Sequence, residues 1–422
     1  MELKENKIKL FKHQEDGLEK TKEFNKVAYF WDMGTGKTFM GSEKMKELNN
    51  QINLVVCQLS KVNDWIKHFT KLYHNYEVFN ITDNKELKKF INSNSKKIGV
   101  INYDKIFRRN ELNKLKDFTL ILDESSIIQN ENTSRAKAIM KLNYKNIILL
   151  SGTPVSGKYE KLWSQSHLLG WNISKKLFLK QYTITEKMEL PNGAFANKII
   201  GYKNIERLKK KLRSHGANFM KTEEVIDLPE QSFININHST SSEYEIFRKD
   251  RIVNIDGETL IGDMTLTNLL YQRLLLGISN QKLLALKDLI DSTNRRIVVF
   301  YNFKKELEKI KSIIDRPLSI INGDEKDLTA YENYENSITI VNYQAGAKGL
   351  NLQKANILVY YSPTLSCEDY MQSKKRIHRI GQELPCFYYK LIAPDSIEPR
   401  IYKALERGED YTNDLFEMEE NK

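Results

Sequence analysis

Short apolar runs alternate with charged, helix-like segments along most of the chain, and this alternation constrains the fold more than any other feature. The runs are Val27–Trp31, Leu54–Cys57, Lys97–Ile101, Phe118–Leu122 and Asn146–Leu150, then Arg296–Tyr301, Leu318–Ile321, Ser337–Val341, Ile357–Tyr360 and Cys386–Leu391. Strands of a parallel sheet are buried on both faces and therefore read as continuous apolar runs joined by helical crossovers. The two series predict an α/β fold with two successive domains, each a mostly parallel sheet flanked by helices.

The pattern changes between the two series, where "NIERLKKKLRSHG" and "LTNLLYQRLLLG" have the spacing of amphipathic helices. We expect helical insertions at about residues 157–220 and 240–285. The domain boundary is expected near Pro229, which gives domains of residues 1–228 and 229–422.

The formal net charge of +11 favours a polyanionic partner, although a solvated lysine-rich surface gives the same total. Cys57, Cys367 and Cys386 lie far apart without metal-ligand spacing, which is typical of unpaired thiols in a reducing compartment. The chain shows neither an apolar signal core nor a run long enough to span a membrane, so we expect a soluble intracellular protein with no membrane partner.

The turn "MGTGKT", residues 33–38, follows the first apolar run and precedes a helical segment. Gly34 and Gly36 would let backbone N–H groups close around phosphate oxygens at the positive end of that helix. Lys37 would reach the β- and γ-phosphates, and the Thr38 hydroxyl would hold Mg²⁺. The strict phosphate-loop pattern has glycine where this chain has Trp31, so a simple strand-to-helix turn is an alternative. We expect the Trp31 ring to pack beneath the loop.

Asp123 and Glu124 end another apolar run, in "FTLILDESS". At the carboxyl edge of a parallel sheet, one carboxylate can coordinate the metal through water while its neighbour orients the attacking water. Alternatively, the acids cap a helix that begins near Ser125.

The run that ends in "LLSGTP" places hydroxyl groups at the same predicted edge, where they could sense the γ-phosphate; a local turn is the alternative.

In the second domain, Arg376 and Arg379 are spaced so that a helix would place both on one face, where they could stabilise transition-state charge. A solvated basic helix would show the same spacing. Gly346 and Gly349 follow a predicted strand and suit close backbone approach to a ligand.

Taken in order, these segments resemble the motifs of superfamily two helicases, and specifically the Swi/Snf-type DNA translocases. Further matching segments are "LFKHQEDGLEK", "LVVCQLSKVNDWIKHF", "VINYDKI", "FMKTEEVIDLP", "QKLLALKDLI", "AGAKGLNL" and "QSKKRIHRIGQ". The phosphate loop of this family itself lacks the first glycine, and "HRIGQ" together with "GLNL" is specific to this branch. The resemblance covers nearly the whole chain.

The resemblance implies two tandem RecA-like domains that bind ATP and Mg²⁺ and hydrolyse ATP. Gln14 would read adenine, and the other implied nucleotide-binding residues are Gly34, Thr35, Gly36, Lys37, Thr38, Gly349 and Arg379. Thr38 and Asp123 would hold the metal, and the implied catalytic residues are Lys37, Asp123, Glu124, Arg376 and Arg379. Coupling would involve Ser151, Gly152, Thr153 and Gln372, and nucleic acid would contact Lys61, Trp65, Asn102, Tyr103, Asn302, Phe303, Gly346 and Asn351.

The implied activity is DNA-dependent ATP hydrolysis coupled to translocation along, or remodelling of, duplex or branched DNA, with contacts mainly to the phosphate backbone. We expect a monomeric, compact prokaryotic or phage form in the cytoplasm of a prokaryotic cell or infected host; any protein recruiter is unknown. An ATP-latched recombination or annealing factor with weak turnover is an alternative. A strand-separating DNA or RNA helicase is another, and an ATPase unrelated to nucleic acid is a third.

Overall fold

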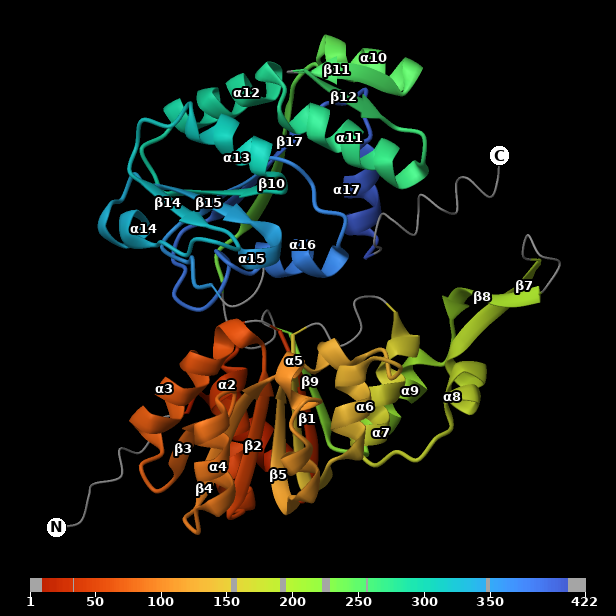
Figure 1. Cartoon of the computed structure of the whole chain (residues 1–422), viewed down its shortest axis with the longest axis vertical. Helices are drawn as coiled ribbons and strands as arrows, with labels where there is room; N and C mark the ends of the chain where they lie inside the picture. Colours follow the sequence, from red (N-terminus) through yellow and green to blue (C-terminus); the bar gives the residue numbers. More distant parts are fainter. Residues whose placement is uncertain are drawn as a thin grey trace. The chain divides into compact units, whose positions relative to one another are not determined.

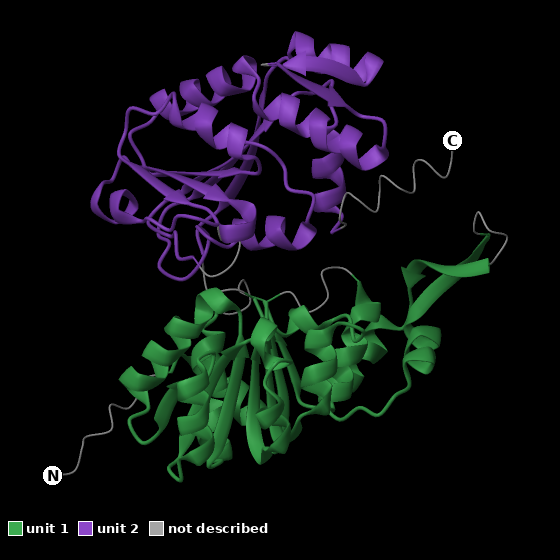
Figure 2. Cartoon of the chain, viewed as in Figure 1, with its two compact units in different colours: residues 1–225 green, residues 226–422 purple. Residues whose placement is uncertain are grey.

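A computed structural model describes residues 10–32, 34–152, 158–189, 195–221, 228–255, 257–346 and 350–408. The chain divides into two compact units, Met1–Val225 (unit 1) and Ile226–Lys422 (unit 2), shown in different colours in Figure 2. The predicted boundary between residues 228 and 229 lies close to this division.

Unit 1 contains a seven-stranded sheet among its described residues, with the strand order β3-β4-β2-β5-β6-β1-β9. Its strands are β1 (Lys26–Trp31), β2 (Ile52–Cys57), β3 (Glu77–Asn80), β4 (Lys97–Asn102), β5 (Lys116–Asp123), β6 (Asn143–Ser151) and β9 (Ala217–Met220). Every pairing in this sheet is parallel, so all seven strands end at the same edge.

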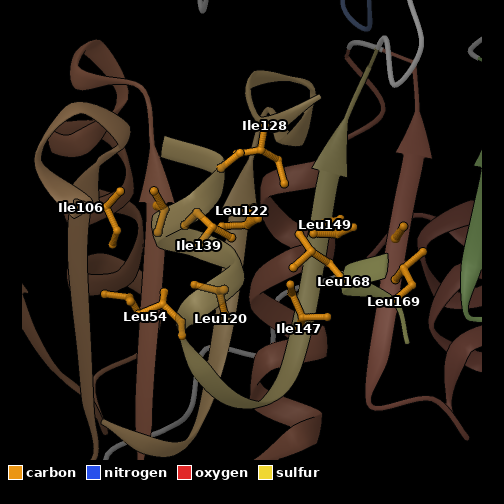
Figure 3. Packing of buried hydrophobic residues seen from close by; sticks show 14 of the residues in the cluster. Leu54, Ile106, Leu120, Leu122, Ile128, Ile139, Ile147, Leu149, Leu168 and Leu169 are labelled. Atoms are coloured by element: carbon orange, nitrogen blue, oxygen red, sulfur yellow. The ribbon is translucent and has the colours of Figure 1, made fainter. Parts of the chain in front are cut away.

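Helices cover both faces of this sheet (Figure 1). They are α1 (Lys12–Thr21), α2 (Lys37–Leu48), α3 (Val62–Leu72), α4 (Asn84–Asn92), α5 (Tyr103–Ile106), α6 (Ser134–Lys141), α7 (Trp163–Leu168), α8 (Lys175–Tyr182) and α9 (Ile205–Arg213). The apolar side chains of α1, α2 and α3 pack on one face, and those of α4 to α9 pack on the other. Figure 3 shows part of the second layer, where Leu54, Leu120 and Leu149 from neighbouring strands lie among helix side chains.

The first insertion differs from the helical expectation because it also contains a hairpin. Strands β7 (Thr183–Glu189) and β8 (Phe195–Tyr202) pair antiparallel and extend away from the main sheet of unit 1 (Figure 1). Its first strand opens with Thr183, Ile184 and Thr185, whose β-branched side chains favour strand over helix. The chain then passes through α9 and adds β9 to the edge of the main sheet beside β1.

Unit 2 contains a six-stranded, wholly parallel sheet among its described residues, with the strand order β10-β17-β16-β13-β15-β14. The strands are β10 (Gln231–Asn237), β13 (Ile297–Tyr301), β14 (Leu318–Ile321), β15 (Ile338–Asn342), β16 (Ile357–Tyr360) and β17 (Cys386–Ile392).

Helices flank this second sheet as well (Figure 1). They are α10 (Ser242–Asp250), α11 (Thr265–Gly277), α12 (Asn280–Asp291), α13 (Lys304–Lys311), α14 (Thr329–Asn333), α15 (Tyr343–Gly346), α16 (Cys367–Lys374) and α17 (Glu398–Glu406). A buried ion pair between Lys282 and Glu398 joins α12 to α17. The second insertion, like the first, contains an unexpected antiparallel hairpin, formed by β11 (Ile252–Ile255) and β12 (Glu258–Ile261).

The predicted fold class is therefore confirmed: each unit is a parallel sheet flanked by helices, and the insertions add helices and a hairpin to each. Across the described ranges, no helix combines the length and the apolar character needed to cross a membrane.

Candidate nucleotide site and motif segments

The strand order of unit 1 gathers the predicted nucleotide-binding segments at one edge of the sheet. The segment "MGTGKT" follows β1, Asp123 ends β5, and Ser151 ends β6, which lies between those two strands. Because all three strands run parallel, these segments lie at their shared carboxyl edge. In open α/β sheets this edge is where ligands bind.

The phosphate-loop glycines adopt backbone conformations that other residues rarely reach. Gly34 has a φ of 86° and Gly36 a φ of 80°, both in the left-handed region. Gly36 directly precedes α2, which begins at Lys37 and contains Thr38. The N-terminus of α2 therefore follows a glycine turn that can present backbone N–H groups to an anion. Met33 lies outside the described residues.

Gln14 packs against this loop. Its Oε1 accepts a hydrogen bond from the Phe11 N–H (3.0 Å), and its Nε2 donates to the Thr35 carbonyl (3.3 Å). A Cβ atom on Gly36 would lie 2.2 Å from Gln14 Nε2, so a larger residue there would have to displace the Gln14 amide. The neighbouring His13 also reaches the loop, with its Nε2 3.1 Å from the Thr35 carbonyl oxygen.

Lys37 turns back over the loop towards the end of β1. Its Nζ donates to the carbonyl oxygens of Trp31 (2.8 Å) and Asp32 (3.0 Å). The Thr35 hydroxyl also donates to the Asp32 carbonyl, at 2.8 Å. These contacts hold the ammonium group within the turn, where a phosphate would find a cation already positioned.

Trp31 precedes the loop, and its side chain packs in the core of unit 1. Its side chain is fully buried, and its Nε1 donates to Asn218 Oδ1 on β9 (2.8 Å). The ring packs against Gly17 of α1 so closely that a Cβ there would lie 2.5 Å from Trp31 Cζ2. The prediction that this residue has a packing role is confirmed.

Two hydrogen bonds from other segments hold Asp123. Trp65 Nε1 donates to Asp123 Oδ2 (2.8 Å), and the Tyr103 hydroxyl donates to the Asp123 carbonyl (3.0 Å). Burial raises the pKa of the Asp123 carboxyl, while the Trp65 hydrogen bond and the charges of Lys37 and Lys61 act in the opposite direction. The Lys37 charge thus acts on this carboxyl from the phosphate loop.

Glu124 follows with a φ of 56°, an uncommon left-handed conformation for a residue with a side chain. A short 3-10 helix does begin at Ser125, but Glu124 makes no side-chain hydrogen bond that caps it. Capping of that helix by the Glu124 side chain therefore does not account for an acid at this position.

The third segment, at the end of β6, is only partly described. Ser151 is fully buried and pairs with Phe30 of β1 in the sheet, and Gly152 follows it. Thr153 lies outside the described residues.

Three residues predicted to contact nucleic acid are buried in unit 1. Trp65 and Tyr103 are each 2% exposed and Asn102 is 3% exposed, so little of these side chains is accessible, and their contact with nucleic acid stays a prediction. Trp65 stacks on Phe69 with ring centroids 5.3 Å apart, because its apolar ring lies on the face of α3 that packs against the sheet. Lys61 is half-buried and forms an ion pair with Asp64 (Nζ to Oδ2, 2.9 Å).

The predicted helix carrying Arg376 and Arg379 is also corrected. Helix α16 ends at Lys374, and both arginines lie in the turns that follow. They still converge, because each Nη1 donates to the Leu350 carbonyl, at 3.1 Å from Arg376 and 3.4 Å from Arg379. Arg379 also donates to Asn351 Oδ1. Burial lowers the pKa of Arg379, whose guanidinium is only partly solvated.

The segments "GLNL" and "HRIGQ" are thus joined within unit 2. Gln382 strengthens the junction, because its Nε2 donates to the carbonyls of Gln353 (3.1 Å), Ala355 (2.8 Å) and Ile377 (3.1 Å). Gln372 is buried on α16 and donates to Glu368 Oε1 at 2.9 Å. Gly346 is the last residue of α15, and Gly349 lies outside the described residues.

The side chain of Asn302 is engaged inside unit 2. Its Nδ2 donates to Ser362 Oγ (2.8 Å) and to the Pro363 carbonyl (3.0 Å), so in this structure the amide organises neighbouring loops. The Phe303 ring lies under Arg273, with the guanidinium carbon 5.1 Å from the ring centroid. Both side chains are half-buried, and their contact with nucleic acid stays a prediction.

Sequence reasoning missed the contacts of His13, Trp65, Tyr103 and Gln382. The position of His13 next to Gln14 was a usable signal for a loop contact. The hydrogen bonds to Asp123 join residues 58 and 20 positions apart, and spacing along the chain does not predict them.

Comparison with known families decides the relationship. The SNF2-related domain matches residues 13–281, more than half of the chain, and the helicase conserved C-terminal domain matches residues 281–381. This chain belongs to the SNF2-related family.

Individual SNF2-related relatives are distant. YwqA of Bacillus subtilis (strain 168), provisionally described as an ATP-dependent helicase/translocase, is 25% identical over 350 residues, covering 73% of this chain and 37% of that protein. The ISWI chromatin-remodeling complex ATPase ISW1 of Saccharomyces cerevisiae is 22% identical over 431 residues, covering 89% of this chain and 38% of that protein. The chain spans less than two-fifths of the length of these two relatives.

Among solved structures, the SWI2/SNF2 ATPase core of Sulfolobus solfataricus in complex with dsDNA is 21% identical, with a TM-score of 0.46. The match covers 96% of this chain and 92% of that one.

Proposed function

We propose that this SNF2-related chain is a DNA-dependent ATPase that couples ATP hydrolysis to translocation along, or remodelling of, duplex or branched DNA. The observation that carries the proposal is the shared carboxyl edge of β1, β5 and β6, where the glycine turn, the Asp123–Glu124 pair and Ser151 lie together. Family membership supports the same activity.

The residues around the loop fit ATP. Gly34 and Gly36 supply the left-handed turn, and Thr35 and Gln14 brace it through hydrogen bonds. Lys37 would exchange its carbonyl partners for phosphate oxygens, a stronger charge-assisted interaction. Gln14 would read the adenine edge, and Gly349 and Arg379 would contribute from unit 2.

Magnesium prefers oxygen ligands, and the donor set fits that preference: Thr38 offers a hydroxyl and Asp123 a carboxylate. The bound metal would supply charge neutralisation at the phosphates. Glu124 would orient the attacking water, and its position directly after Asp123 at the sheet edge supports that role.

The remaining proposed roles rest on the motifs of both units. Arg376 and Arg379 would stabilise the charge that develops during phosphoryl transfer. Ser151, Gly152, Thr153 and Gln372 would couple nucleotide state to nucleic-acid binding. Lys61, Gly346 and Asn351 stay candidates for backbone contacts to DNA; Asn351 is exposed and Lys61 is half-buried.

Displacement of a third strand from a triplex-bearing duplex tests the coupling of hydrolysis to movement. A translocase releases the third strand only with hydrolysable ATP, and it leaves the two duplex strands paired. Separation of the duplex strands would instead support a helicase. Tight DNA binding without any displacement would support the ATP-latched factor and contradict the proposal.

A further inference from the structure

Asp123 is held from two directions by segments that follow neighbouring strands. Trp65 lies on α3, which follows β2, and Tyr103 begins α5, which follows β4. The strand order β4-β2-β5 places these segments in sequence beside the end of β5, where Asp123 lies. One hydrogen bond holds a carboxylate oxygen and the other holds the backbone carbonyl.

These two hydrogen bonds fix the orientation of the Asp123 carboxylate. The indole N–H can only donate, so the Trp65 hydrogen bond assigns Oδ2 of Asp123 to the protein interior. The Trp65 hydrogen bond therefore restricts the direction in which the carboxylate can present an oxygen to a metal or its water. The Trp65 ring is itself packed against two neighbours on α3: Phe69, stacked at 5.3 Å, and His68, edge-on at 5.9 Å.

The same two segments carry cations on their outer surfaces. Lys67 on α3 and Arg108 just after α5 are exposed, and Lys61 at the start of α3 is half-buried. A polyanion that contacts this side of unit 1 would therefore meet the helix that carries Trp65 and the short helix that carries Tyr103. Each segment has exposed cations together with one exposed acid, Asp64 on α3 and Asp104 on α5, and an inner side chain that bonds to Asp123.

We propose that Trp65 and Tyr103 are positioning residues that transmit nucleic-acid binding on α3 and α5 to the carboxylate of Asp123. This inference deepens the proposed function and rests on it. A shift of either segment by a fraction of an ångström would lengthen a hydrogen bond to Asp123 and reorient the metal-binding oxygen. Contact with DNA would hold both segments in the productive arrangement.

Trp65→Phe tests this inference because it keeps an aromatic ring on Phe69 and removes the N–H. Hydrogen bonds from groups behind a metal ligand typically change metal affinity or activity by about 10- to 100-fold. We expect the Mg²⁺ concentration for half-maximal binding of a fluorescent ADP analogue to rise about tenfold. DNA affinity, measured by anisotropy, should stay within about twofold, while the ratio of DNA-stimulated to unstimulated ATP turnover falls towards one.

The matched control is Trp163→Phe. Trp163 also lies in unit 1 and loses an indole hydrogen bond of the same length, to the Ile173 carbonyl (2.8 Å), but it is not bonded to Asp123. This variant should keep the wild-type Mg²⁺ dependence and stimulation ratio. Tyr103→Phe removes a single hydroxyl and gives an independent answer if Trp65→Phe folds poorly; its stimulation ratio should fall as well.

Wild-type Mg²⁺ dependence and stimulation in both Trp65→Phe and Tyr103→Phe would overturn the inference. Equal losses of stimulated and unstimulated turnover, with unchanged Mg²⁺ dependence, would show a merely structural role and overturn it too. Failure of the proposed function is distinguishable, because the wild-type protein itself would then show no stimulation by DNA.

Discussion

At the residue scale, Trp31 explains how the phosphate loop tolerates the absence of its usual first glycine. The indole is buried on the face of the sheet that α1, α2 and α3 cover, and it is anchored to Asn218 of β9. Its bulk is accommodated because α1 has Gly17 at the point of contact. The indole therefore fills core space between α1 and β9, and the glycines that the turn requires are Gly34 and Gly36.

Gly17→Ala should disturb the packing of the Trp31 indole against α1. Alanine stabilises a helix by about 1 kcal/mol relative to glycine. However, its Cβ would lie 2.5 Å and 2.7 Å from two carbons of the Trp31 ring. Overpacking a buried site costs about 1–3 kcal/mol, so we expect a net destabilisation of about 1 kcal/mol and weaker nucleotide binding. Denaturant unfolding followed by tryptophan fluorescence measures the first effect, because all four tryptophans lie in unit 1.

Gly323→Ala is the control for this substitution, since no heavy atom lies within 4 Å of the added Cβ. Unchanged or increased stability of unit 1 in Gly17→Ala would show that the contact with Trp31 is not tightly packed.

Arg379→Ala should remove the positive charge proposed to act in the transition state. Loss of such an arginine typically lowers turnover by about 10³-fold, or roughly 4 kcal/mol of barrier. Nucleotide affinity should change little, because Lys37 and the glycine turn supply the main phosphate contacts. Steady-state phosphate release and fluorescent-nucleotide titration separate the two effects.

Arg248→Ala, an exposed arginine of α10 in the same unit, should keep wild-type turnover. Arg379 is preferable to Arg376 for this test, because Arg376 is buried and its loss would also disturb the fold. Turnover of Arg379→Ala close to that of the wild-type protein would rule out the proposed catalytic role.

At the element scale, the central strands could be predicted because both of their faces are buried. Strands β1, β2, β5 and β6 are apolar along most of their length, and the sequence shows this directly. The edge strands β3, β9 and β10 were missed because they are short or alternate polar and apolar residues, as in "QSFININ". An edge strand has one free side, so its sequence need not form an apolar run.

The segment after α16 shows why spacing alone was insufficient for the arginines. An i,i+3 spacing fits a helix, but the chain turns after Lys374, with the Arg376 N–H donating to the Ser373 carbonyl at 3.1 Å. Contacts to Leu350, 26 and 29 residues away, then set the side-chain positions. The spacing of nearby residues does not predict contacts between residues so far apart in the sequence.

Helix α3 should make unit 1 sensitive to acid through His68. Burial lowers the pKa of His68 to about 4, below the ordinary value of 6.5, so the unfolded chain takes up the proton first. The contribution of neutral His68 to the unfolding free energy is therefore fully present above about pH 6.5 and is lost as the pH falls towards 4. Allowing for the partly exposed ring, this loss is about 2 kcal/mol.

His68→Gln should therefore flatten the dependence of unfolding free energy on pH between 6.5 and 4, as measured by urea unfolding of unit 1. The exposed His74, two residues after α3, provides the control, because His74→Gln changes a side chain that is solvated in both states. A pH dependence as steep in His68→Gln as in the wild-type protein would show that His68 does not contribute to it.

At the scale of the whole molecule, each unit has its own core and its own parallel sheet. The two series of apolar runs predicted this organisation, because each series suffices for one sheet. The site was predictable to the level of motifs, since the glycine turn and the acidic pair follow strands in the sequence. Which side chains hold Asp123 was not, because that depends on the order of the strands across the sheet.

The proposed function requires that nucleic acid stimulate ATP hydrolysis at the carboxyl edge of unit 1. Phosphate release should be measured with single-stranded, duplex, forked and four-way DNA and with RNA, for the wild-type protein and for Lys37→Ala. We expect duplex or branched DNA to raise the wild-type rate severalfold, with stimulation that weakens steeply as salt increases. Lys37→Ala should release no phosphate under any condition. A wild-type rate that is the same with every nucleic acid as without any would contradict the proposed function.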